Sequence, residues 1–257
     1  DQKAFGRTYC RFCCRTYYEG VSVLSVRKEL RMAFLGASWE YDCKSCSTAW
    51  KMSFATQWHA QKKSRKLNVR HSFSAMTLYL EDKDAFFNHV IQQVFPSPST
   101  QDYTPIIKEA MTALGFGAKL SIGTWRSKTG EENQSSLFQV FDRNTVALKR
   151  FVDCYLVKKF NAEQQTLNKF IVAKFSGDAV WQAEMAAEQQ RKKVKQFSSA
   201  QKIVWLYQHA ETIMMDMVRA EVKKSGNTVL ANVHDAVVVR NQIPAKLLAK
   251  IERKVQL

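Results

Sequence analysis

Apolar residues recur at helical spacing through most of this chain. The pattern predicts helical segments at 49–59, 76–95, 106–120, 137–175, 179–197 and 198–224, with one more after residue 244. Pro105 stands where the first turn of a helix accepts proline. The Pro-Ser-Pro-Ser run at 96–99 is a clear break in the pattern, and residues 126–136 form a polar loop.

The end of the chain has a different, strand-like pattern. Residues 228–233 and 236–239 are rich in β-branched and apolar side chains, and only His234 and Asp235 separate them. Residues 38–42 are expected to end another strand. The predicted class is therefore α+β, mostly helical, with a small antiparallel sheet.

Length and composition allow a sizeable core. The chain has 257 residues, of which 46% are hydrophobic, so one or two domains are expected. We divide it into an N-terminal part (1–60), a helical middle (61–197) and a C-terminal part with the hairpin (198–257).

The charge balance is strongly basic. Lys and Arg number 39 against 23 Asp and Glu, a formal net charge of +16. This excess suits a polyanionic partner, most simply nucleic acid, although a basic protein without such a partner remains an alternative. No apolar run approaches a membrane span, and no secretory signal opens the sequence. We expect no membrane partner and an intracellular setting: host cytoplasm, nucleoid or, for a viral protein, the virion.

Two cysteine pairs have the spacing of a four-cysteine zinc site. They are Cys10-x₂-Cys13 and Cys43-x₂-Cys46. Neither pair is followed by the glycine usual in a zinc knuckle. One reading of the chain is therefore a non-catalytic zinc-ribbon module that binds nucleic acid or assists replication.

Two acids have settings that suit metal binding. Asp235 lies at the tip of the predicted hairpin, and Asp42 lies at the end of a predicted strand. Carboxylates held rigidly in this way are the hard ligands that Mg²⁺ prefers, and a pair of them could hold two ions. The alternative for Asp235 is a turn residue with no further role.

A third element lies between the acids. On the helix predicted from residue 106, Lys108, Thr112 and Phe116 share one face, and Gly117 follows. Lys108 could contact triphosphate oxygens, and Phe116 could stack on a base. The alternative is an amphipathic core helix with a solvated lysine.

In this order the three elements resemble motifs A, B and C of the family A DNA polymerases and the single-subunit phage-type RNA polymerases. Asp42 matches the strand-end aspartate of motif A. Lys108, with Phe116 and Gly117 following at the family spacing, matches the fingers helix of motif B. His234 and Asp235 match the hairpin of motif C.

The resemblance implies a fingers and palm architecture and template-directed nucleotide addition. Residues 1–60 and 198–257 would be palm parts, and 61–197 would be fingers-like. Asp42 and Asp235 would bind two Mg²⁺ ions, with the Cys43 carbonyl completing the shell. Lys108 would neutralise the triphosphate, Phe116 and Gly117 would shape the base pocket, and His234 would orient the primer end or the metal-binding turn. Gln208, on the helix before motif C, matches a polar family position and would contact nucleotide.

Departures from the family pattern favour RNA synthesis. Five residues after Asp42, the DNA polymerases carry a glutamate that excludes the 2′-hydroxyl; here Ser47 leaves room for it. Ala236 likewise replaces a second acid common in the DNA enzymes. Two further departures do not bear on this preference in the same way: Phe116 in place of a tyrosine weakens strict sugar discrimination, and Thr104 replaces a basic residue of motif B. We expect an RNA polymerase or primase, with a replicative DNA polymerase as the alternative. Only 41 residues precede Asp42, so the family's thumb and other N-terminal parts would be absent, rebuilt or supplied by a partner chain.

Overall fold

The fold was analysed in a computed structural model. It describes residues 7–9, 16–18, 27–61, 68–97, 100–123, 125–126, 132–133, 135–233 and 235–255. The chain divides into two compact units. The first contains Asp1–Cys46 and Trp205–Leu257, and the second contains Ser47–Val204.

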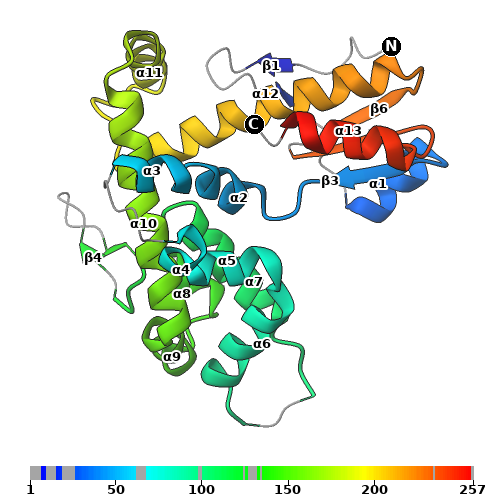
Figure 1. Ribbon diagram of the computed structural model, residues 1–257. Helices are drawn as coiled ribbons and strands as arrows, with labels where there is room; N and C mark the ends of the chain where they lie inside the picture. Colours follow the sequence, from blue (N-terminus) through cyan, green and yellow to red (C-terminus); the bar gives the residue numbers. More distant parts are fainter. Residues whose placement is uncertain are drawn as a thin grey trace. The chain divides into compact units, whose positions relative to one another are not determined.

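The first unit is built on a three-stranded antiparallel sheet in the order β3-β7-β6. Its strands are β3 (Trp39–Asp42), β6 (Val229–Val233) and β7 (Ala236–Val239). Around it lie α1 (Lys28–Leu35), α12 (Ser199–Lys224, from Trp205 on) and α13 (Ala245–Val255), labelled in Figure 1. The strands β1 (Arg7–Tyr9) and β2 (Thr16–Tyr18) pair separately with each other.

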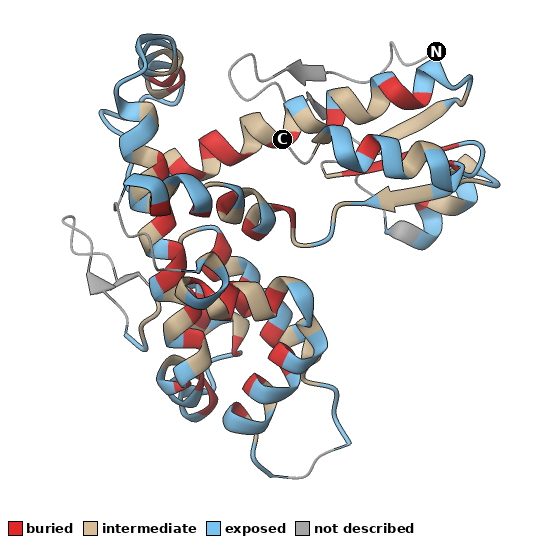
Figure 2. Ribbon diagram, viewed as in Figure 1, coloured by how far each residue is buried: buried red, intermediate tan, exposed pale blue. Residues whose placement is uncertain are grey.

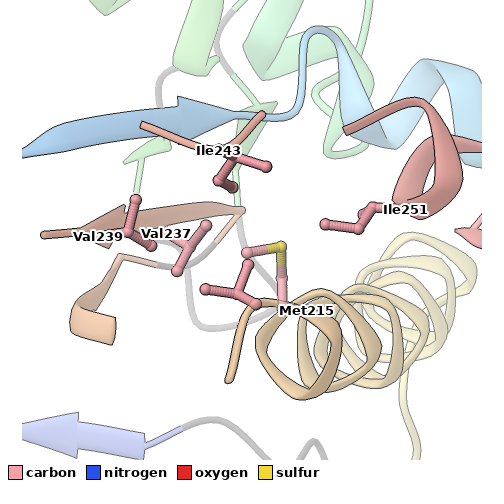
Figure 3. Packing of buried hydrophobic residues seen from close by; sticks show 6 residues of the cluster. Met215, Val237, Val239, Ile243 and Ile251 are labelled. Atoms are coloured by element: carbon pink, nitrogen blue, oxygen red, sulfur yellow. The ribbon is translucent and has the colours of Figure 1, made fainter. Parts of the chain in front are cut away.

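Helices α12 and α13 bury the apolar side of this sheet. Met215 of α12 packs with Val237 and Val239 of β7, and Ile251 of α13 closes the same cluster (Figure 3). All four residues of β7 are buried, as expected for a central strand covered on both faces. The Tyr41 hydroxyl accepts a hydrogen bond of 2.7 Å from the Ile243 amide, which joins β3 to the segment before α13.

The second unit is almost entirely helical. A two-residue ladder pairs β4 (Trp125–Arg126) with β5 (Glu132–Asn133). The helices are α2 (Cys46–Ser53, from Ser47 on), α3 (Ala55–Gln61), α4 (Val69–Ser72), α5 (Ser74–Glu81), α6 (Lys83–Val94), α7 (Thr104–Gly115), α8 (Ser136–Val140), α9 (Thr145–Asp153), α10 (Tyr155–Ser176) and α11 (Ala179–Arg191).

Helix α10 organises the core of the second unit, with buried positions spaced along it in Figure 2. Phe160 of α10 meets Tyr79 of α5 and Phe86 of α6, with ring centroids 5.0 and 5.6 Å apart. One turn further on, the buried Glu163 accepts hydrogen bonds from the amides of Ala75 and Met76. This carboxylate satisfies two donors at the start of α5 that have no partner within the helix. Burial nevertheless raises the pKa of Glu163.

The predicted class is confirmed, because the chain is mostly helical with a small antiparallel sheet. Several predicted boundaries were wrong. The helix predicted over 76–95 is two helices that meet at Asp82, whose carboxylate accepts from the Ala85 amide and begins α6. The helix predicted to reach residue 120 ends at Gly115. The loop predicted over 126–136 contains β5 and residues of β4, and α11 ends at Arg191 rather than 197.

A buried carboxylate joins α12 to α13. Glu221 is 4% exposed, and its oxygens lie 2.6 Å from the Lys254 ammonium and 3.0 Å from that of Lys250. Lys224 approaches the same carboxylate to 3.4 Å. Hydrogen bonds from Lys254, Lys250 and Lys224 lower the pKa of Glu221 from 4.5 to about 2.

We predict that Glu221→Gln makes the first unit less stable at neutral pH and less sensitive to acid. Because the folded-state pKa is lowered, the stabilising contribution is present above pH 4.5 and is lost as the pH falls from 4.5 to about 2. Thermal unfolding of both proteins across this range checks the prediction. Glu252→Gln, an exposed change on α13, is the control. An unchanged acid response in Glu221→Gln would contradict it.

Candidate active site

The two predicted metal-binding acids lie at the same end of the β3–β7 ladder. Asp42 is the last residue of β3 and pairs with Ala236, the first residue of β7. The next backbone amide, that of Cys43, donates to the Asp235 carbonyl over 3.0 Å. Asp235 precedes β7 in the turn, so the strict alternation of faces along a strand does not govern its side chain. Pairing of distant segments therefore places the two acids on neighbouring backbones.

Several neighbouring groups shift the pKa of the Cys43 thiol. A hydrogen bond with Cys46 lowers the pKa of Cys43, and this effect outweighs burial and the carboxylates of Asp235, Asp42 and Glu211, which raise it. The same hydrogen bond and burial raise the pKa of the Cys46 thiol. Three carboxylates thus act on one thiol at the end of the sheet.

Helix α12 contributes two buried residues to this cluster that sequence reasoning missed. Tyr207 is 3% exposed and Glu211 is 4% exposed. The Tyr207 hydroxyl is hydrogen-bonded to Glu211 and Cys46, and burial, followed by these two neighbours, raises the pKa of Tyr207. Residues four apart share a helix face, which was the available signal for this pair. Gln208, the predicted contact, is half-buried on the next position round the helix.

The motif B residues belong to the second unit. Lys108 is exposed on α7, and its carbonyl accepts a 2.8 Å hydrogen bond from the Thr112 hydroxyl. Phe116 follows the helix and is 42% exposed. Lys108 therefore lies on the helix, whereas Phe116, predicted to share its face, lies just beyond the helix end.

Gly117 has a conformational reason to be glycine. Its φ is +93°, and a Cβ there would lie 2.5 Å from the Ala200 Cβ. The Gly117 amide donates to the Leu114 carbonyl and the Ala118 amide to the Ala113 carbonyl. This is the hydrogen-bond pattern of a Schellman helix end, which requires a left-handed residue at that position. The close approach that Gly117 permits in this structure is to Ala200.

Ser47, the predicted sugar-gate residue, lies in the same unit as Phe116. It is half-buried near the start of α2, and its hydroxyl lies 3.7 Å from where a Cβ on Gly115 would be. Ser47 is therefore adjacent to Gly115, which ends α7 and immediately precedes Phe116.

Several predicted residues lie outside the described part of the chain. These are His234 and the first cysteine pair, Cys10 and Cys13. Cys43 and Cys46 are described as free thiols. Within the described ranges, no group of three or more His, Cys, Asp or Glu side chains has a metal-binding arrangement.

The acids at the sheet end nonetheless have the donor chemistry for Mg²⁺. This ion is usually held by one or two carboxylates together with water and substrate phosphates, rather than by a protein cage of many ligands. Asp42 is exposed and Asp235 is half-buried, so carboxylate oxygens can meet a hydrated ion there. Carboxylate oxygens of this kind are the donors that a magnesium site would need.

Comparisons with protein families, with curated proteins and with solved structures give no match. Among the described helices, none combines the length and apolar character needed to cross a membrane.

We predict that Tyr207→Phe destabilises the first unit by about 1–3 kcal/mol. The change leaves buried hydrogen-bonding groups of Glu211 and Cys46 without the hydroxyl, and such groups are costly to leave unpaired. Denaturant unfolding measures the effect. Tyr155→Phe, at a site that is 72% exposed, is the matched control and should change stability by less than about 0.5 kcal/mol. Equal effects of the two variants would show that the Tyr207 hydroxyl has no structural role.

Proposed function

We propose that this chain is a template-directed nucleotidyltransferase of the palm type. The observation that supports this most is the β3–β7 register, with Asp42 opposite Ala236 and the Asp235 carbonyl bonded to the next amide. Two acid-bearing segments that are far apart in the sequence meet at one end of the β3–β7 ladder. The motif order that resembles polymerase motifs A, B and C supports the same conclusion independently.

In this proposal Asp42 and Asp235 hold divalent metal, with the Cys43 carbonyl as a further ligand. When bound, two Mg²⁺ ions lower the pKa of the attacking 3′-hydroxyl and neutralise charge on the transferring phosphoryl group. The residues of the chain fix the geometry. Backbone pairing holds Asp42, the turn before β7 holds Asp235, and the Tyr207–Glu211 pair borders the site from α12.

The second unit would bind the incoming nucleotide. Lys108 is exposed and free to place its ammonium on triphosphate oxygens. Phe116 would stack on a base, next to Gly117 and Ser47. His234 would orient the primer end, and Gln208 would contact nucleotide or template. The net charge of +16 suits binding of template and product backbones, and such binding weakens as salt rises.

We predict that Asp42→Ala and Asp235→Ala each reduce primer extension by about a hundredfold or more, because each removes a ligand that stabilises charge in the transition state. Radiolabelled primer extension with Mg²⁺ measures this. Asp84→Ala, which removes an exposed acid of α6, is the control and should extend normally. Unfolding curves of all three variants should lie within about 1 kcal/mol of the parent protein. Extension retained in either of the first two variants would refute the proposal.

The product is expected to be RNA, because Ser47 leaves space for a ribose hydroxyl. We predict that the protein uses rNTPs with a higher kcat/KM than dNTPs, and that Ser47→Glu lowers the ratio of the two values by at least about tenfold through steric exclusion of the 2′-hydroxyl. Ser53→Glu, an exposed change at the end of the same helix, is the control. If the parent protein extended primers with dNTPs but not with rNTPs, the result would instead support a DNA polymerase.

A further inference from the structure

Lys51 is a buried cation in the second unit. It lies on α2 with 1% of its surface exposed. Its ammonium donates to the Gly115 carbonyl over 2.7 Å and to the Gln164 side-chain oxygen over 2.6 Å. One side chain therefore links α2, α7 and α10.

Keeping this amine buried is costly. Burial lowers the pKa of Lys51 from 10.5 to about 7, and no carboxylate within the described residues opposes that effect. Neutral partners alone hold a group that is partly charged near neutral pH. A buried methionine would fill similar space without this cost, so the amine is best explained by what it binds.

The bond to Gly115 completes the end of α7. The Schellman pattern there uses the carbonyls of Ala113 and Leu114, and the Phe116 amide bonds the Thr112 carbonyl. The Gly115 carbonyl is the last one of the helix, and Lys51 supplies its donor. A cation at this position also interacts favourably with the helix dipole.

Ser47 and Lys51 reach the same residue from one face of α2. They are four residues apart, and both side chains approach Gly115. Gly115 is bonded directly to Phe116, and the backbone of Gly117 passes too close to Ala200 to leave room for a Cβ. The backbone is thus closely packed on both sides of Phe116.

We propose that Lys51 is a positioning residue of the nucleotide pocket, holding the end of α7 so that Phe116 and Ser47 keep a fixed spacing. This inference rests on the proposed function, because it assigns Phe116 to the incoming base. Lys51 itself is buried and touches no substrate. Its loss should weaken nucleotide binding more than it slows chemistry.

Lys51→Met tests the proposal with two readouts. Hydrogen exchange at the amides of Phe116, Gly117 and Ala118 should accelerate by about tenfold, since the helix end loses a strong hydrogen bond. In primer extension, the KM for nucleotide should rise by about tenfold while kcat changes by less than about threefold. Lys169→Met, an exposed change on α10, should leave both readouts at parent values.

We call the two hydrogen bonds of Lys51, to the Gly115 carbonyl and to the Gln164 side chain, the Lys51 clamp. A further variant separates the effects of these two bonds. Gln164→Met keeps the Lys51–Gly115 bond and should change KM and exchange less than Lys51→Met does. If Lys51→Met does not fold, Lys51→Met combined with Gln164→Met removes both partners of the buried hydrogen bond between the Lys51 amine and the Gln164 amide, and the same two results are expected of it.

The outcomes distinguish this inference from the proposed function. If the parent protein extends primers and Lys51→Met exchanges faster at residues 116–118 with unchanged KM, Lys51 is only structural and the positioning role is overturned. If hydrogen exchange at these amides is unchanged in Lys51→Met, Lys51 does not hold the end of α7, whatever the result of primer extension. If the parent protein extends no primer, the proposed function fails and the nucleotide role fails with it, while exchange still reports on the clamp.

Discussion

The pairing of β3 with β7 is the interaction on which the first unit depends. It joins a strand near the start of the chain to one near its end, with four residue pairs in register from Trp39–Val239 to Asp42–Ala236. Within the described three-stranded sheet, β7 is the only strand with which β3 pairs, so this ladder also positions the segment that follows β3. The same ladder aligns the turn at Asp235 with the backbone amide of Cys43. The fold and the candidate site therefore share one determinant.

Much of this fold could be read from the sequence because the strongest signals are local. The β-branched and apolar runs in residues 228–239 and the long helical period before them are properties of neighbouring residues. The misplaced boundaries are cases where one polar or glycine position outweighed a continuous apolar pattern. Asp82 captures the amide of Ala85 and starts a new helix, although the apolar residues on either side would suit a single one. Gly117 ends α7 through its positive φ, and the apolar residues beyond it could not extend the helix.

The site was less accessible to sequence reasoning than the fold. Spacing made a four-cysteine zinc site one alternative, yet two cysteines three apart can bring their thiols together with or without a metal. Cys43 and Cys46 do so here, in hydrogen-bond contact with each other. Tyr207 and Glu211 could not be assigned, because their contacts cross from α12 to the segment after β3. Such contacts depend on tertiary packing, which the period of a single helix does not specify.

Two buried glutamates of α12 show how environment separates structure from function. Glu221 lies among three lysines, and its lowered pKa means that folding favours its charge. Glu211 instead acts, together with Asp42 and Asp235, on the Cys43 thiol at the end of the sheet. Like charges in one place destabilise a fold unless a cation relieves them. Glu221 thus has lysine partners, whereas Glu211, Asp42 and Asp235 all act on one thiol. In the proposed two-metal chemistry, these acids would border the place where the cations bind.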